Sequence, residues 1–148
     1  MIHFNILIEQ VRSYSPSYGV PPYHLKALFT DDMRTLSIQH PDPHVSYIGV
    51  YIWESYNKED LLHYLKHSKE YFQMPEYCRP EFIKFQLKRL SNDSELNEWK
   101  VNQTAIAIGI IMGSCKKMGL KATVIDMQDE PTTYLPNTSI YCFIKVHK

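Results

Sequence analysis

Apolar residues recur with helical spacing in some segments of the chain and alternate in others, which predicts both helices and strands. Over residues 2–12, Phe4, Leu7 and Val11 share one helical face; the same stretch also alternates as a strand would, and we favour the helix. The proline pair at 21–22 is typical of a helix start. The further predicted helices cover 21–29, 58–72, 80–90 and 96–118, and the predicted strands cover 34–39, 45–55, 120–127 and 139–146.

The order of these elements predicts the fold class. Two prolines between His40 and His44 are typical of a turn between antiparallel strands. Helical and strand-forming stretches are segregated, and no linker or repeat interrupts the chain. We therefore expect a single α+β domain over residues 1–148, with an antiparallel or mixed sheet, flanking helices and a buried central helix.

The predicted helix at 96–118 is apolar around its whole circumference, most clearly over TAIAIGIIM at 104–112. Its apolar run is too short to cross a bilayer, so we expect protein to cover it on all sides and expect no membrane association. Gly109 and Gly113, with Ala105 one turn earlier, form a stripe where a second backbone can approach closely. This pattern predicts a homodimer formed through the helix Thr104–Met118.

Composition narrows the possible chemistry. The chain has 148 residues with 16 Lys plus Arg against 16 Asp plus Glu, so no overall charge favours nucleic acid or anionic membranes. The five glycines are too scattered for the Gly-rich dinucleotide or P-loop motifs, and the metalloprotease, serine-hydrolase and zinc-ribbon motifs are also missing from the sequence. Three scattered cysteines suggest reduced thiols, and the first residues do not resemble a signal peptide, so we expect a cytoplasmic protein.

Two stretches carry a family resemblance. The first stretch resembles the opening helix of the nitroreductase family with its phosphate motif, and it reads ILIEQVRSYSPSYGVPPYHLKALF at 6–29. The second resembles the family's central helix, turn and strand, and it reads VNQTAIAIGIIMGSCKKMGLKATVIDM at 101–127. Gly119 and Leu120 match the turn best. The resemblance implies a nitroreductase-like α+β fold that binds FMN at a dimer interface. It also implies hydride transfer from NAD(P)H through FMN to a nitroaromatic or quinone-like acceptor, by a ping-pong reaction.

The resemblance also implies site residues. Arg12 and Ser13 align with the second Arg and the Ser of the phosphate motif, while Val11 and Ser15 stand at its other two arginine positions. We expect Arg12, Ser13 and Ser15 to bind the cofactor, with Lys145 or Lys148 joining Arg12 at its phosphate. We expect backbone amides around Asp126 to contact the flavin ring. No side chain is identified as the catalytic acid or base. The candidate residues on the substrate side are Tyr14, Tyr18 and Tyr23.

Other residues that could suggest a metal site or nucleic-acid binding are better explained as parts of ordinary helices. His63 and His67 share a helical face, but Lys66 beside them favours a solvated basic face over a metal site, and we expect no metal. The mixed basic and aromatic segment 79–90 favours an amphipathic helix over nucleic-acid binding. The main alternative to the enzyme is a non-catalytic protein-interaction module on a flavin-free α+β fold, whose many tyrosines would contact a partner.

Overall fold

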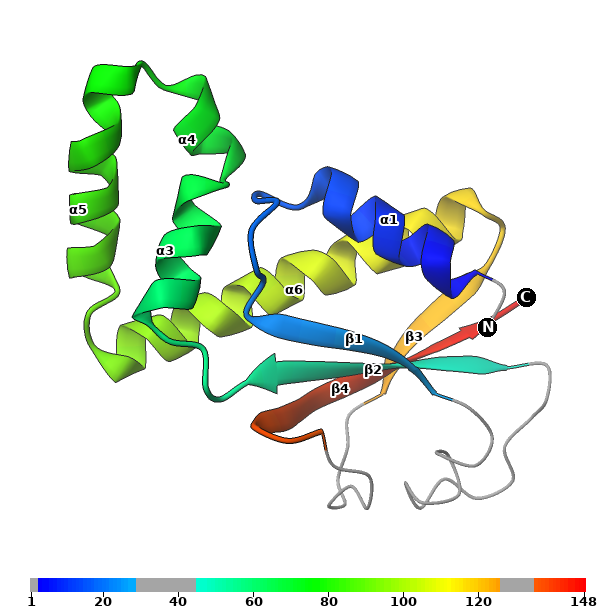
Figure 1. Cartoon of the computed structure of the whole chain (residues 1–148). Coiled ribbons are helices and arrows are strands. Elements are labelled where there is room, and N and C mark those ends of the chain that lie inside the picture. The colour runs from blue at the N-terminus through cyan, green and yellow to red at the C-terminus, as the bar shows by residue number, and fades with distance from the viewer. Residues whose placement is uncertain (1–2, 29–44, 126–134) are drawn as a thin grey trace.

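A computed structural model describes residues 3–28, 45–125 and 135–148 of the chain. These residues form an α+β fold with one antiparallel sheet, which confirms the predicted class (Figure 1). No helix in the described ranges is long and apolar enough to span a membrane. The helices are α1 Phe4–Tyr14, α3 Lys58–Lys66, α4 Lys69–Gln73, the 3-10 helix η1 Glu76–Cys78, α5 Arg79–Arg89 and α6 Asp93–Lys117, and the strands are β1 Tyr23–Leu28, β2 Ser46–Trp53, β3 Lys121–Ile125 and β4 Thr138–His147.

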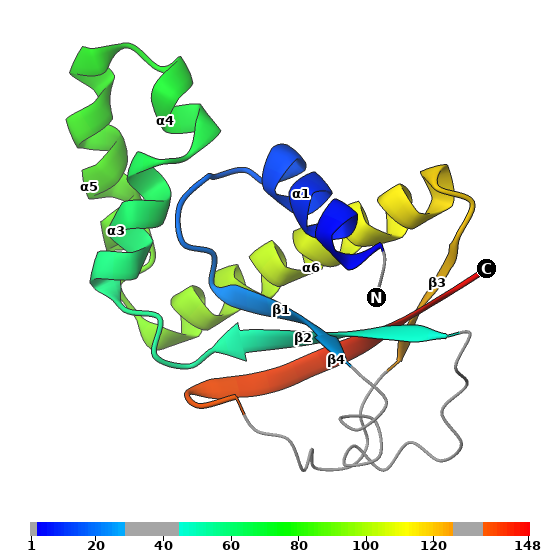
Figure 2. The ribbon, with the colours of Figure 1, turned by 45° about the vertical axis from the view of Figure 1, so that its right-hand side comes forward.

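The four strands pair antiparallel in the order β1-β2-β4-β3, so β1 and β3 form the edges. Side chains alternate along each strand, so Ile48, Val50 and Ile144 lie on the same face of the sheet. Helices α1 and α6 lie across this face (Figure 2). Leu7 and Val11 from α1 join Ala107, Ile111 and Cys115 from α6 in this core. Burying these apolar side chains between the helices and the sheet holds the helices on the sheet.

The opposite face of the sheet carries an aromatic cluster of its own. Leu28, Tyr47 and Phe143 are buried together there. The ring of Tyr51 lies over Gly49, and a Cβ added to this glycine would meet the ring at 2.6 Å. A side chain at position 49 would therefore displace the phenol.

A separate group of helices, α3, α4 and α5, stands at one end of the sheet; we call it the helical lobe (Figure 1). Its core contains Leu61, Tyr64 and Leu65 of α3 together with Trp99 near the start of α6. Asn57 caps α3 in a reciprocal capping box with Asp60, as a side-chain amide before a helix predicts. The lobe is thus built around the first turns of α6.

Two predicted elements are wrong. Residues 23–28 form strand β1, not part of a helix over 21–29, because they pair along β2 and the Pro22 carbonyl accepts a hydrogen bond from Trp53 N at 2.9 Å. The predicted helix 58–72 is two helices, because α3 ends at Lys66 and the extended residue Ser68 begins α4, which its side chain caps by accepting from Tyr71 N. The predicted strand 34–39, the turn at His40–His44 and residues 126–127 lie outside the described residues.

The prediction of all-round burial for the central helix is wrong for the isolated chain. The side of α6 that carries Ala107, Ile111 and Cys115 is buried, but Ile106 is 42% exposed and Gly109 and Gly113 are exposed. The small-residue stripe therefore faces outward. A Cβ added to either glycine would meet no atom within 4 Å.

Candidate functional site

The end of α1 and the loop that follows it bring together most of the residues predicted to bind the phosphate. Arg12 and Ser13 are exposed in the last turn of α1, and Ser15 is buried just beyond it. The Ser15 hydroxyl donates to the Ser17 carbonyl at 3.1 Å and accepts from Ser17 N, so it shapes the loop. Arg12 and Ser13 thus remain accessible to a ligand, whereas the Ser15 side chain is engaged inside the protein.

This loop is held against α3 over its whole length. The Ser17 hydroxyl donates to the Tyr64 carbonyl at 2.6 Å, and Tyr18 N donates to the His67 carbonyl at 3.0 Å. Gly19 passes so close to α3 that an added Cβ would meet Tyr64 Cα at 2.6 Å. The glycine is required by this close backbone approach.

Two lysines that lie far away in the sequence reach the end of α1. The Lys69 ammonium group donates to the Ser13 carbonyl at 2.6 Å and lies over the Tyr18 ring, 5.2 Å from its centroid. The Lys117 ammonium group lies over the Tyr14 ring at 5.8 Å. Arg12, Lys69, Lys117, Tyr14 and Tyr18 together form what we call the cation–aromatic cluster.

Electrostatics at this cluster favour an anion. Tyr14 is 60% and Tyr18 is 65% exposed, so both rings and the cations on them face solvent. Ammonium groups over aromatic faces are attracted by the ring quadrupole and are held in place at little cost. An anionic oxygen approaching here would find several charge-assisted donors within one region of the surface.

Other predicted site residues do not join this cluster. Lys145 pairs across the sheet with Tyr47 and lies, by strand alternation from Phe143, on the face opposite the helices, whereas Arg12 belongs to the helix side. Lys148 follows β4 and is exposed. Asp126 lies outside the described residues. Lys145 therefore does not join Arg12, and the cations that contact the residues beside Arg12 are Lys69 and Lys117.

Tyr23 differs from the two exposed tyrosines. It is 8% exposed in the core between the sheet and the helices, and burial raises the pKa of its phenol. Sequence position alone groups Tyr14, Tyr18 and Tyr23, but the structure places only the first two at the surface of the cluster.

His63 and His67 stack at 4.2 Å between ring centroids, as their spacing along α3 predicts. His63 Nδ1 accepts a hydrogen bond from Val20 N at 3.2 Å, and His67 Nδ1 lies 2.8 Å from the His63 carbonyl. One nitrogen of each ring thus contacts backbone. In the parts of the chain that the structure describes, no three His, Cys, Asp or Glu residues are grouped to hold a metal ion.

The exposed side of α6 borders a second candidate surface. Ala105 and Ile108 of α6, Val124 of β3, and Tyr141 and Cys142 of β4 line a cavity of about 330 Å³. The register of β2 and β4 shifts between Val50 and Tyr51, so that Tyr141 is an extra residue in β4. Val124 and Tyr141 are 42% and 40% exposed, so this apolar surface continues from the glycine stripe onto the sheet.

No known family model matches this chain. A comparison with curated proteins likewise finds no match.

The sequence contains no local signal for Lys69 and Lys117. Lys69 lies 56 residues from Ser13, whose carbonyl it contacts, and Lys117 ends a helix as an ordinary dipole-compensating residue would. Only the contacts that α4 and α6 make with α1 reveal that both lysines reach the end of α1.

Proposed function

We propose that the chain is an FMN-dependent NAD(P)H oxidoreductase of the nitroreductase type and reduced size, which acts as a homodimer on a nitroaromatic or quinone-like acceptor. The cation–aromatic cluster at the end of α1 is the observation that carries this proposal. It places two further cations at the end of the helix that carries Arg12, the residue that aligns with the phosphate motif. The α+β fold with a long helix packed on an antiparallel sheet is compatible with it.

The donor set at the cluster fits the phosphate of FMN. A phosphate dianion takes several charge-assisted hydrogen bonds, and a guanidinium with two ammonium groups supplies them without a Gly-rich loop. Lys69 is fixed by its hydrogen bond to Ser13 and Lys117 by its contact with Tyr14. In this arrangement Arg12, Lys69 and Lys117 hold the phosphate, and the exposed Tyr14 and Tyr18 rings lie beside it as flat apolar surfaces.

FMN, when bound, supplies the hydride chemistry of the reaction. The chain's own residues would anchor the phosphate and limit access of water to the ring. No side chain of this chain is assigned a proton-transfer role, because hydride exchange through a flavin does not demand one. The acceptor and NAD(P)H would use the same site in turn.

The homodimer would form through the outward side of α6. A helix with exposed Val101, Ile106 and two glycines buries this surface most simply against an equivalent helix, because small residues allow close backbone approach. The neighbouring cavity at Val124 and Tyr141 would then lie at the edge of the interface. A binding site between subunits would be completed in this way.

An absorption spectrum tests the proposal directly. Purified protein is mixed with FMN and desalted, and retained flavin bands in the visible region are the expected result. Arg12→Ala and Lys69→Met should each weaken FMN binding by about 1.5–3 kcal/mol, which is the contribution of a hydrogen bond to a charged group. The matched control is Lys58→Met, an exposed lysine at the start of α3 in the helical lobe. Wild-type FMN affinity in both cluster variants would contradict the assignment of the phosphate site.

One observation favours the alternative of a non-catalytic interaction module. The described cavities on α6 and in the helical lobe are not lined by Arg12 or Ser13, and the apolar surface of α6 is exposed without any cofactor residue on it. A protein that retains no FMN after desalting but associates with itself or a partner through α6 would support this alternative.

A further inference from the structure

The helical lobe contains a cavity of its own, remote in the fold from the outward side of α6. It has a volume of about 440 Å³ and lies between α3, α4, η1 and α5. Six residues line it: Lys66, Tyr71, Glu76, Arg79, Pro80 and Ile83. This volume is within the range of sites that hold small organic molecules.

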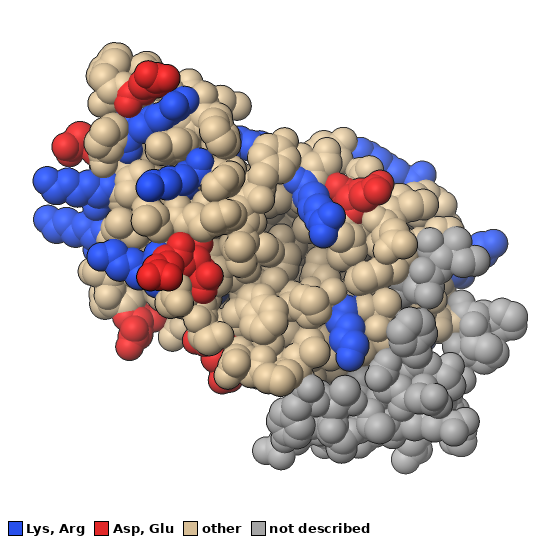
Figure 3. All heavy atoms as spheres, viewed as in Figure 1, with Lys and Arg blue, Asp and Glu red and all other residues tan. Residues whose placement is uncertain are grey.

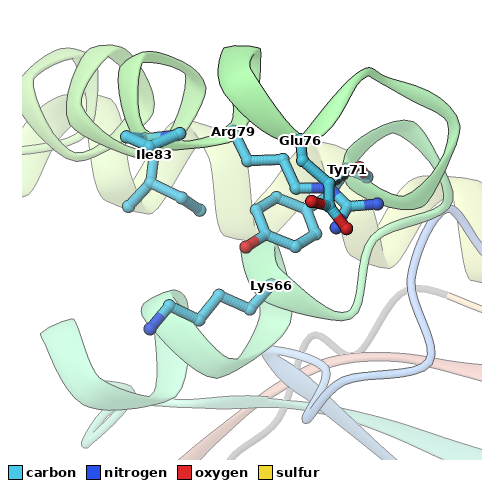
Figure 4. Close-up of a pocket in the computed structure, with 6 residues that line it drawn as sticks. Lys66, Tyr71, Glu76, Arg79 and Ile83 are labelled. Atoms are coloured by element: carbon cyan, nitrogen blue, oxygen red, sulfur yellow. Dashed lines mark hydrogen bonds between the residues drawn. The ribbon is translucent and has the colours of Figure 1, made fainter.

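The position of Arg79 is fixed by the protein itself. Its Nε donates to the Tyr71 carbonyl at 3.1 Å and an Nη donates to the Phe72 carbonyl at 3.5 Å. Its guanidinium carbon lies 5.0 Å from the centroid of the Tyr71 ring, so the two side chains form a stacked wall. Figure 4 shows the Glu76 side chain on the same side of the cavity as Arg79, and both residues line it.

The other end of the cavity has an uncompensated cation. Figure 4 shows the Lys66 ammonium and the Tyr71 hydroxyl pointing to the side where Ile83 lies. Within the described part of the chain neither of these two polar groups has a hydrogen bond or ion pair. Two free donors therefore face the same space.

The walls between these ends are largely apolar. The Tyr71 ring, the Pro80 ring and the Ile83 side chain provide flat and aliphatic surface. Phe82 packs on Tyr71 from α5, with 6.3 Å between ring centroids, and supports the wall from behind. A ligand here gains from burying a flat apolar body and from placing one anionic group at the donors.

We propose that this cavity binds a small organic carboxylate with a flat apolar body, with the carboxylate on Lys66 and Tyr71 Oη and the body against Tyr71, Pro80 and Ile83. A cationic ligand is disfavoured because the Lys66 ammonium lines the cavity, and a multiply charged anion is disfavoured because the Glu76 carboxylate lines it as well. The proposal is independent of flavin binding, since it involves none of the residues of the cation–aromatic cluster.

Ligand titration of the full chain, followed by amide NMR, tests this assignment. The probes are 3-phenylpropionate, its neutral amide and 3-phenylpropylamine, which share a body and differ in charge. We expect 3-phenylpropionate to shift amides of α3, α4 and α5, the amide to bind at least tenfold more weakly, and the amine not to bind. Equal binding of all three, or shifts located away from these helices, would overturn the proposal. N-acetylphenylalanine, compared with 3-phenylpropionate, distinguishes a peptide C-terminus from a free acid as the source of the carboxylate.

Variants separate recognition from folding. Lys66→Met keeps the aliphatic stem and should weaken binding of 3-phenylpropionate about 10- to 100-fold, as loss of a charge-assisted hydrogen bond implies. Tyr71→Phe removes only the hydroxyl and should weaken it about tenfold or less. Lys84→Met, on α5 but outside the cavity lining, is the matched control and should bind as wild type. Unchanged affinity in Lys66→Met, with a native amide spectrum, would rule out the proposed carboxylate contact.

Discussion

Replacing the two glycines on the outward side of α6 should raise the stability of the monomer and, where the new side chain is large, weaken its self-association. Gly109 and Gly113 lie inside a 25-residue helix, and an added Cβ at either position meets nothing within 4 Å. Glycine in a helix interior costs about 0.8–1.0 kcal/mol relative to alanine, so Gly109→Ala with Gly113→Ala should stabilise the monomer by about 1.6–2 kcal/mol. Urea unfolding at low protein concentration measures this gain.

Leucine at the same two positions is the matched comparison. Leucine has a helix propensity close to that of alanine, so Gly109→Leu with Gly113→Leu should leave the monomer nearly as stable as the alanine variant. The larger side chains would fill the groove, and overpacking at a helix interface costs about 1–3 kcal/mol per site. Light scattering and sedimentation at micromolar concentration should therefore show a dimer for wild type and a monomer for the leucine variant. Wild-type association of the leucine variant, or a monomeric wild type, would refute pairing through this side of α6.

Three further predictions concern the fold around the site. Gly19→Ala should destabilise the protein by about 1–3 kcal/mol, because the new Cβ would lie 2.6 Å from Tyr64 Cα and 2.9 Å from the His63 carbonyl oxygen; chemical unfolding tests it, and an unchanged free energy of unfolding would show that the loop accommodates the new side chain. Asn57→Ala removes the side-chain half of the α3 capping box and should cost about 1 kcal/mol in thermal or urea unfolding, whereas Asn97→Ala, exposed inside α6, should cost nothing. Burial and nearby Lys26 lower the pKa of His24, so the folded state binds fewer protons there than the unfolded state, and stability should fall as the pH drops from about 6.5 through that lowered pKa. His24→Gln should remove this contribution to the pH dependence of stability. An NMR titration of the wild-type ring checks the shift and should give a midpoint below 6.5.

Local signals were sufficient for several elements. The β-branched and aromatic run at 45–55 predicts β2, and Asn57 before an apolar pattern predicts the start of α3. Gly119, after two lysines, predicts the end of α6, and it has the positive φ of 73° that favours glycine there. Each of these signals lies within a few residues of the structure that it specifies.

Contacts between residues far apart in the sequence could not be predicted from such local signals. Residues 23–28 are a strand only because β2 lies beside them, while the prolines at 21–22 gave a local helix signal. The cation–aromatic cluster depends on the same kind of contact, since Lys69 reaches Ser13 across 56 residues. Arg12, Ser13, Tyr14 and Tyr18 were therefore predicted as neighbours in sequence, whereas their cationic partners appear only when α4 and α6 are placed in space.

The short bridge between Ser17 and Ser68 has a consequence for the order of folding. Tyr18 N bonds to the His67 carbonyl and Lys69 N bonds to the Pro16 carbonyl at 2.9 Å, so this connection closes a loop of about 50 residues that contains β1, β2 and α3. During synthesis this bridge cannot be completed until residue 69 has left the ribosome. Closing so long a loop costs conformational entropy before the contacts of the bridge are made. Once the β1–β2 pair and α3 have formed, fewer free residues separate Ser17 from Ser68, and the entropy cost is smaller. The bridge should therefore form late and lock the N-terminal segment only after the helical lobe is in place.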